Sequence, residues 1–163
     1  MTIAHVSLLD ERTIITIEGT DAGAWVLPCG MTSLYRRHLT ADPPLPEDLT
    51  NAIGEMTDHL DDARRELPLL GDATSVVVSG PAARAMAAVE HGGRVNSLTF
   101  VLSRDAAEDV FRTLATEATA DRRQNPGLPN DLVDAIVGGC CAMVALIRGL
   151  GLDSVTVSMV DQP

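Results

Sequence analysis

The feature that most constrains the fold of this chain is an unbroken run of apolar residues and glycines over positions 135–147. A helix over this range is apolar nearly all round, so it is expected to lie in the middle of the fold. The run is flanked by Asp134 and Arg148 and is too short to cross a bilayer, so no membrane span is predicted. Gly138 and Gly139 each destabilise a helix by about 1 kcal/mol relative to alanine, which indicates close packing against another backbone.

The other apolar patterns predict one α/β domain around this helix. Short apolar runs predict strands over residues 3–9, 13–17, 25–27, 74–78 and 155–158, the first three as an antiparallel meander. Helices are predicted over residues 32–38 and 47–67, over about 81–89, after an N-cap at Ser103, and over 130–148. A meander followed by βα crossovers gives a mixed sheet flanked by helices.

The charge of the chain excludes several classes of function. The net charge is −11, with 23 acidic residues against 12 basic ones, and all of the basic residues are arginine. A nucleic-acid partner is therefore not expected, because long-range repulsion opposes binding of a polyanion. The lack of lysine excludes Schiff-base chemistry and a phosphate-loop lysine. The charge does not exclude a small local pocket lined by arginine side chains.

The cysteines and the first residues favour a cytoplasmic location. Cys29 is isolated, and Cys140 and Cys141 are neighbours in a predicted helix, where their side chains point about 100° apart. All three are predicted to be buried free thiols in a reducing compartment. The start, MTIAHVSLLDE, has neither the basic residues nor the cleavage site of a secretory signal.

Two long stretches of the chain resemble one protein family. The stretch LPCGMTSLYRRHLTADPPLPEDL, over residues 27–49, is similar to a segment of the exopolyphosphatase and guanosine pentaphosphate phosphohydrolase (Ppx/GppA) family. The family segment reads LPLG, then a short basic helix, then DPP-x-PEEL. The stretch over residues 102–158 is similar to the family's LSREDLEALLERLA…ERR…PGL…RADVIVAGALILLALLRALGLDEITVS. The order and spacing are kept, so the resemblance covers nearly the whole chain.

The resemblance implies a fold and a domain. Family members have two ribonuclease H-like domains, of the superfamily that contains actin, the sugar kinases and the heat-shock ATPases, with the active site between them. Residues 1–163 resemble the second domain alone. The first domain, which carries a phosphate loop and the catalytic glutamate in the family, is not expected in this sequence.

The first phosphate-binding loop that the resemblance predicts is not glycine-rich here. Family members open this domain with a sequence close to D-I-G-G-G-S-T-E, and the corresponding residues are HVSLLDERT. Bulky leucines and the carboxylates of Asp10 and Glu11 replace the glycines that let a backbone approach a phosphate. A metal site at Asp10 or Glu11 is one reading, and a solvated hairpin turn is the favoured one.

A second phosphate-binding turn is partly kept. The family's G-T-G-G-T-x-R-A-L-A corresponds to residues 78–87, where Ser79, Gly80 and Arg84 are candidate ligand-binding residues. Pro81 has no N–H to donate, so a retained phosphate site and a purely structural turn both stay open. After Ser158 the family continues D-x-G-L-R-E-G, whereas this sequence reads MVDQP, so a potential carboxylate and the closing helix are predicted to be lost.

No metal or catalytic site is predicted from the other polar residues. The four histidines stand in different predicted elements without ligand spacing; they are His5, His38, His59 and His91. The run Arg36-Arg37-His38 is expected to form a solvated basic face, because consecutive helical residues fan around the axis.

These observations lead to one hypothesis and two alternatives. The first is a non-catalytic Ppx/GppA-like domain that acts as a binding, assembly or regulatory module, either as a homodimer or with a full-length family member. The second is a Mg²⁺-dependent phosphohydrolase of polyphosphate or guanosine pentaphosphate, whose first domain another polypeptide supplies. The third is a sensor of a phosphate-bearing nucleotide or alarmone, without turnover. No cofactor is expected, except Mg²⁺ in the second case.

Overall fold

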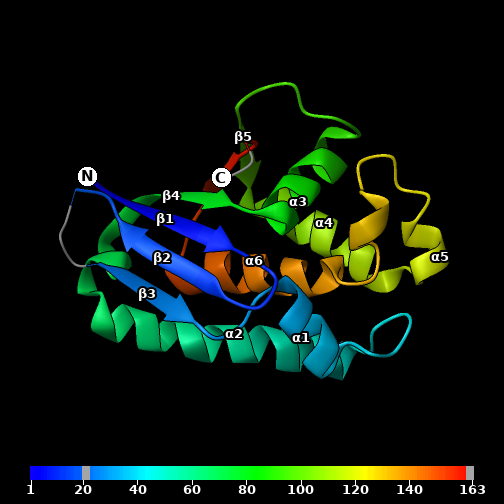
Figure 1. The fold of residues 1–163 in the computed structure, drawn as a ribbon, viewed down its shortest axis with the longest axis horizontal. Coiled ribbons are helices and arrows are strands. Elements are labelled where there is room, and N and C mark those ends of the chain that lie inside the picture. Colours follow the sequence, from blue (N-terminus) through cyan, green and yellow to red (C-terminus); the bar gives the residue numbers. More distant parts are fainter. Residues whose placement is uncertain (20–22, 161–163) are drawn as a thin grey trace.

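The fold is a six-stranded mixed sheet with its helices packed against it (Figure 1). The computed structural model describes residues 1–19 and 23–160. Its strands are β1 (Thr2–Leu8), β2 (Thr13–Ile17), β3 (Ala24–Leu27), β4 (Ala73–Ser79), β5 (Thr99–Ser103) and β6 (Ser154–Ser158). Its helices are α1 (Met31–His38), α2 (Pro46–Glu66), α3 (Pro81–His91), α4 (Arg104–Thr116), α5 (Thr119–Arg122) and α6 (Ile136–Leu150), with short 3₁₀ turns η1 (Pro68–Asp72) and η2 (Asn130–Leu132).

The sheet has the order β3-β2-β1-β4-β6-β5. Strands β1, β2 and β3 pair antiparallel, as the sequence predicts, and β4 pairs parallel with both β1 and β6. Strand β5 was not predicted. It pairs antiparallel with β6 at the edge of the sheet, so its existence depends on a partner some 55 residues further along the chain.

The predicted central helix is confirmed, with a different start. Twelve of the residues of α6 are buried, from Ile136 to Ile147. The sequence predicts a helix from Asn130, but residues 130–132 form the turn η2 and α6 begins at Ile136. Before Ile136 the exposed Asp131 and Asp134 alternate with buried or partly buried apolar residues, so the regular helix begins where continuous burial begins.

The glycines of α6 let the backbones of three helices come close together. A methyl group on Gly138 would clash with the carbonyl oxygen of Met31 and would lie 2.9 Å from the amide nitrogen of Tyr35, both in α1. A methyl group on Gly139 would lie against the side chain of Ala82 in α3. The close packing against another backbone that the sequence predicts is confirmed at Gly138, while Gly139 packs against side chains.

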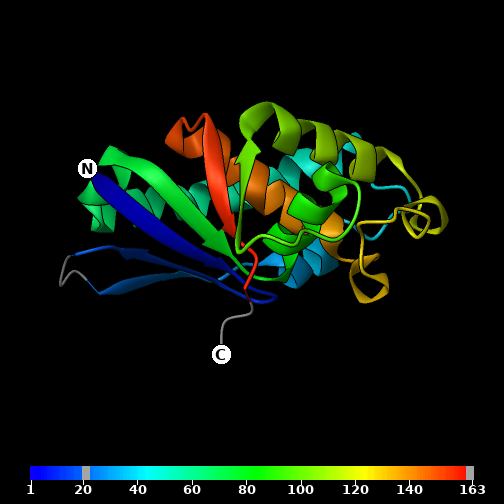
Figure 2. The same cartoon turned by 90° about the horizontal axis from the view of Figure 1, so that it is seen from above.

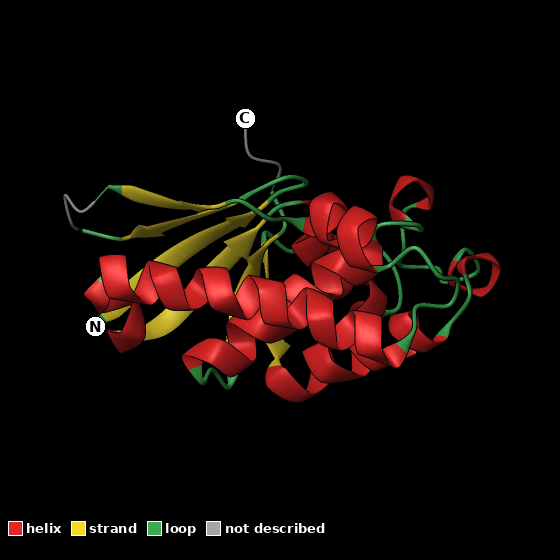
Figure 3. Ribbon diagram, turned by 90° about the horizontal axis from the view of Figure 1, so that it is seen from below, coloured by secondary structure: helices red, strands yellow, loops and turns green. Residues whose placement is uncertain are grey.

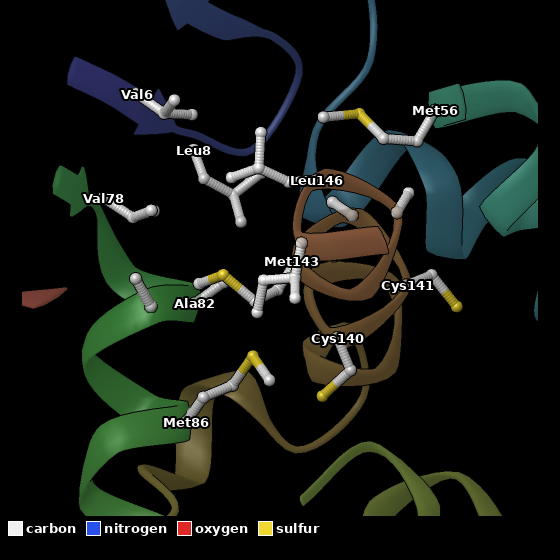
Figure 4. Packing of buried hydrophobic residues seen from close by; sticks show 14 of the residues in the cluster. Val6, Leu8, Met56, Val78, Ala82, Met86, Cys140, Cys141, Met143 and Leu146 are labelled. Atoms are coloured by element: carbon white, nitrogen blue, oxygen red, sulfur yellow. The ribbon is translucent and has the colours of Figure 1, made fainter. Parts of the chain in front are cut away.

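The core lies between α6 and one face of the sheet. Figure 4 shows Met143 and Leu146 of α6 directed toward Leu8 of β1 and Ala82 of α3. The sulfur atoms of Cys140 and Cys141 point in different directions, and all three cysteines are free and buried, as predicted. Burial raises the pKa of the Cys141 thiol to about 12, so it is protonated at neutral pH.

All the long helices gather around α6 on this one face, and the other face of the sheet is open (Figures 2 and 3). The crossovers from β1 to β4 and from β4 to β6 step in the same direction across the sheet, and right-handed crossovers then place their helices on the same side. Residues of the open face are half-buried or exposed. The strand register places His5, Thr16, Val77, Thr156 and Val101 in one row across it.

Among the described residues, no helix combines the length and the apolar character that a bilayer crossing needs.

The N-cap predicted at Ser103 is confirmed, because its Oγ accepts a hydrogen bond of 3.1 Å from the amide of Ala106. This cap fixes the point at which the edge strand β5 turns into α4.

The contact at Gly138 yields a stability prediction. Gly138→Ala is expected to lower the free energy of unfolding by about 2 kcal/mol or more, because α6 and α1 must move apart to admit the methyl group. The matched control is Gly54→Ala in the middle of α2, where the added carbon meets nothing within 4 Å. This control is expected to raise stability by up to about 1 kcal/mol. Urea unfolding followed by circular dichroism measures both, and equal effects would contradict the packing argument.

Candidate functional site

The candidate site is a pocket of about 600 Å³ at the carboxyl edge of the parallel strands. Strands β1, β4 and β6 run in the same direction, so the segments that follow them meet at this edge. Asp10 follows β1, Pro81 and Arg84 follow β4, and Met159 follows β6, and all four residues line the pocket. In open α/β sheets this edge is where ligands bind.

Charged side chains of both signs line this pocket. Arg84 comes from α3 and Arg94 from the loop after it, while Asp10 and Asp131 bring carboxylates. The loop predicted at residues 125–129 is present and lines the pocket with residues 126–129. Two guanidinium groups with two carboxylates suit a small ligand that carries limited negative charge and hydrogen-bond donors.

The three candidate residues predicted from the sequence lie at this edge, in different environments. Ser79 ends β4 and is buried, and its hydroxyl donates a 3.3 Å hydrogen bond to Oγ of Ser7. Gly80 is the N-cap of α3 with a φ of +112°, and a side chain there would clash with the carbonyl oxygen of Leu8. Arg84 alone of the three lines the pocket. Their role in binding a ligand stays a prediction.

The turn after β1 is closed by hydrogen bonds from the start of α1. The carbonyl oxygen of Leu9 accepts from the amide of Met31 at 2.9 Å. The carbonyl oxygen of Asp10 accepts from the amides of Thr32 and Ser33 at 2.9 and 3.1 Å. The hydroxyl of Thr32 also donates to the Asp10 carboxylate at 2.8 Å. Amides that are free at most helix N-termini therefore bind this turn.

The hairpin interpretation of the Asp10-Glu11 turn is confirmed by its geometry. The amide of Leu9 donates to the carbonyl oxygen of Arg12 at 3.0 Å, which joins β1 to β2. Glu11 pairs with Arg36 at 2.7 Å, and the hydrogen bond from this guanidinium lowers the pKa of the carboxyl group. Both side chains are largely exposed, so the pair contributes little to stability.

The residues after Arg36 differ from the prediction of a solvated basic face. Arg37 and His38 both reach Glu55 of α2, with His38 Nε2 at 2.8 Å from Glu55 Oε1. Desolvation by burial raises the pKa of Glu55, but the hydrogen bonds from Arg37 and His38 together outweigh it, so the pKa lies below its usual value. Consecutive side chains converge here because the carboxylate lies between them on a crossing helix, which the sequence of α1 alone does not indicate.

Two kinds of site residue lie beyond what the sequence analysis could place. Arg94 comes from a loop and Asp131 from the short turn η2, whose positions depend on tertiary packing, and no spacing in the sequence links them to Arg84. The sequence predicts that a carboxylate and a closing helix are lost after Ser158, and the last residues to which this prediction applies, 161–163, lie outside the described residues.

The cap that holds the closed turn yields a second prediction. The buried Oγ of Ser33 accepts a 2.8 Å hydrogen bond from the amide of Gly30. Ser33→Ala leaves that buried amide without its acceptor and is expected to lower the free energy of unfolding by about 1–3 kcal/mol. Thr50→Ala in α2 removes an exposed hydroxyl and is expected to change stability by less than about 0.5 kcal/mol. Thermal unfolding of the two variants, each against the wild type, checks the difference.

Comparison with known proteins identifies the fold. No family model and no curated protein matches the chain. An exopolyphosphatase-like protein has a TM-score of 0.88 at 22% identity, over 96% of this chain and 55% of its own. The PPX-GPPA enzyme of Aquifex aeolicus gives 0.84 at 16%, over 97% and 53%, and an exopolyphosphatase from Cytophaga hutchinsonii gives 0.75 at 15%, over 96% and 52%. The chain thus spans just over half the length of each, and it shares the fold of the matched part of these Ppx/GppA structures, as its sequence predicts.

Proposed function

We propose that this chain is a non-catalytic, Ppx/GppA-like domain that binds a small phosphate-bearing ligand at the carboxyl edge of its sheet and acts as a binding or regulatory module. The observation that carries the proposal is the closed turn at residues 9–12. It stands where the resemblance predicts a glycine-rich phosphate loop.

The closed turn argues against phosphoryl transfer by this chain alone. The first amides of α1 bind the carbonyl oxygens of Leu9 and Asp10, so they do not serve a phosphate. The Asp10 carboxylate lines the pocket and repels phosphoryl oxygens unless a cation screens it. A hydrolase needs several donors around the transferred group, and this side of the pocket supplies a fixed negative charge instead.

The opposite side of the pocket supports anion binding. Pro81 opens α3 at the pocket wall, and the positive end of the helix dipole favours negative charge there. Arg84 and Arg94 add two guanidinium groups that match phosphate oxygens. With Asp10 and Asp131 in the same pocket and a net charge of −11, a ligand with one or two phosphates is favoured over a polyphosphate chain.

A thermal-shift assay with matched variants tests the proposed ligand class. The probes are pyrophosphate, guanosine diphosphate and long-chain polyphosphate, each with and without Mg²⁺. Pyrophosphate or the nucleotide at a hundredfold excess over Kd is expected to raise Tm by roughly 5–10 °C. Arg84→Gln and Arg94→Gln should each weaken binding at least tenfold, because each removes a charge-assisted hydrogen bond. Arg112→Gln on the exposed surface of α4 is the control and should bind as the wild type.

Two outcomes would overturn this proposal. If none of the probes raises Tm, the pocket does not bind phosphate-bearing ligands. If the purified chain releases phosphate from polyphosphate or guanosine pentaphosphate with Mg²⁺, it is catalytic without a further domain. Release only after addition of a full-length relative would support the alternative of a hydrolase whose first domain another polypeptide supplies.

We further propose that a second copy of the chain covers the open face of the sheet, which makes the module a homodimer. Val101 at the centre of β5 is 66% exposed, and it lies on the open face because its neighbour Leu102 is buried on the other face. The row from Thr16 to Val101 mixes apolar side chains with hydroxyl groups and the imidazole of His5, which suits a partner that offers both apolar contacts and hydrogen bonds. The free thiols in the core agree with a location in the reducing cytoplasm.

Light scattering coupled to size exclusion tests the dimer. The wild type is expected to elute with twice the mass of one chain, which is 17.2 kDa. Val101→Glu places a charge on the proposed interface and should shift the protein to a monomer. Leu69→Glu in η1, where the side chain is 42% exposed and lies outside the open face, should leave the mass unchanged. A monomeric wild type at micromolar concentration would contradict the proposed dimer, and a complex with a full-length relative would then be the remaining assembly.

A further inference from the structure

A second group of polar side chains lies away from the pocket, between the loop before α1 and helix α2. It consists of Cys29, Glu55 and His59, which we call the Cys29 cluster. Their thiol sulfur, carboxylate oxygen and imidazole nitrogen all lie within 4.8 Å of one another. None of the three residues lines the candidate pocket, so the cluster is a separate feature of the fold.

The fold positions each member of the Cys29 cluster firmly. Glu55 and His59 are four residues apart on α2, so they share one face of the helix, and Nε2 of His59 lies 3.7 Å from Oε2 of Glu55. Cys29 is fully buried, and its carbonyl oxygen accepts a 2.9 Å hydrogen bond from Thr13 of β2. Its sulfur lies 3.5 Å from the sulfur of the buried Met56. The three donor atoms therefore converge without a flexible loop.

We propose that the Cys29 cluster binds a thiophilic divalent cation of the zinc class through the thiolate, the carboxylate and the imidazole. These are the three donor types that Zn²⁺ takes from proteins, at bond lengths of about 2.0–2.3 Å. Around a tetrahedral ion such ligand atoms lie roughly 3.3–3.8 Å apart. The separation of Glu55 and His59 already fits this range, and small side-chain rotations bring in the sulfur.

The surroundings of Glu55 resemble an outer shell around a metal ligand. His38 Nε2 and Arg37 Nε hold Oε1 at 2.8 and 2.9 Å, which fixes the plane of the carboxylate. Hydrogen-bonded carboxylates and imidazoles of this kind orient metal ligands. A second nitrogen of Arg37 contacts Oε2, and it must give way to the ion. The thiolate and carboxylate together supply two negative charges, which balance a divalent cation.

The chemistry of the donors selects among cations. A buried thiolate disfavours Mg²⁺ and Ca²⁺, which take oxygen ligands. Burial raises the pKa of the Cys29 thiol to about 12, so the sulfur is protonated before binding. The cation replaces this proton, which passes to solvent as the sulfur–metal bond forms. The ion can enter from the side of α2, where the side chains of Glu55 and His59 are 22% and 30% exposed.

Absorption spectroscopy with Co²⁺ tests the site directly, because a thiolate bound to Co²⁺ gives a charge-transfer band in the near ultraviolet. The purified chain of 163 residues is titrated with Co²⁺ and then with Zn²⁺ under reducing conditions. The wild type is expected to show the band with one ion per chain and to lose it on addition of Zn²⁺. Cys29→Ser should abolish the band, and His59→Gln should weaken Zn²⁺ binding at least tenfold.

The controls separate this site from nonspecific thiol binding and from misfolding. Cys141→Ser removes another buried thiol, on α6, and should keep the band. His59→Gln changes a partly exposed side chain and keeps the core, so it reports on the site even if Cys29→Ser fails to fold. A wild type without the band, or a folded Cys29→Ser variant that keeps it, would overturn the proposal. Neither result bears on ligand binding at Arg84 and Arg94, so the two proposals fail separately.

Discussion

The close packing of Gly138 against the backbone of α1, and of Gly139 against the side chains of Ala82 and Met31, is the constraint on which the rest of the structure depends. Because neither residue has a side chain, α6 approaches α1 on one side and α3 on another. Both of these helices begin at the carboxyl edge of the sheet, α1 at Met31 and α3 at Pro81. The depth at which α6 packs therefore sets where two helix N-termini stand relative to the strands. A larger residue in the middle of α6 would displace the walls of the pocket as well as the core.

The two helix N-termini use the same physical property differently. Each exposes backbone amides and the positive end of a dipole. At α1 the amides bind the carbonyl oxygens of Leu9 and Asp10, so the field there stabilises the chain's own turn. At α3 the first turn faces the pocket and has Arg84 beside it. Under the proposed function, an anion therefore binds at the N-terminus of α3, whereas the N-terminus of α1 holds the turn at residues 9–12.

Most of the fold could be predicted from the sequence, and most of the site could not. Burial patterns locate the meander, β4, β6 and the central helix, because a run such as residues 135–147 has only one stable environment. Strand β5 was missed because its pairing with β6 is decided by tertiary contact, not by its own residues. Arg94 reaches the pocket from a loop, and Cys29 meets Glu55 across 26 residues of chain. Only the spacing of Glu55 and His59 on α2 is local, and a single such pair is too common to indicate a site.

The separation of fold from site also explains how a chain can keep this architecture with little sequence identity to its structural relatives. The core is made by apolar side chains within strands and helices, and many sequences satisfy that pattern. Binding depends instead on a few residues in the turns after the strands. Leu9 and Asp10 are half-buried and exposed, so glycine or bulky residues at these positions leave the core unchanged. A TM-score of 0.88 at 22% identity therefore describes the shared core. The binding chemistry of each chain depends on the residues in its own turns after the strands.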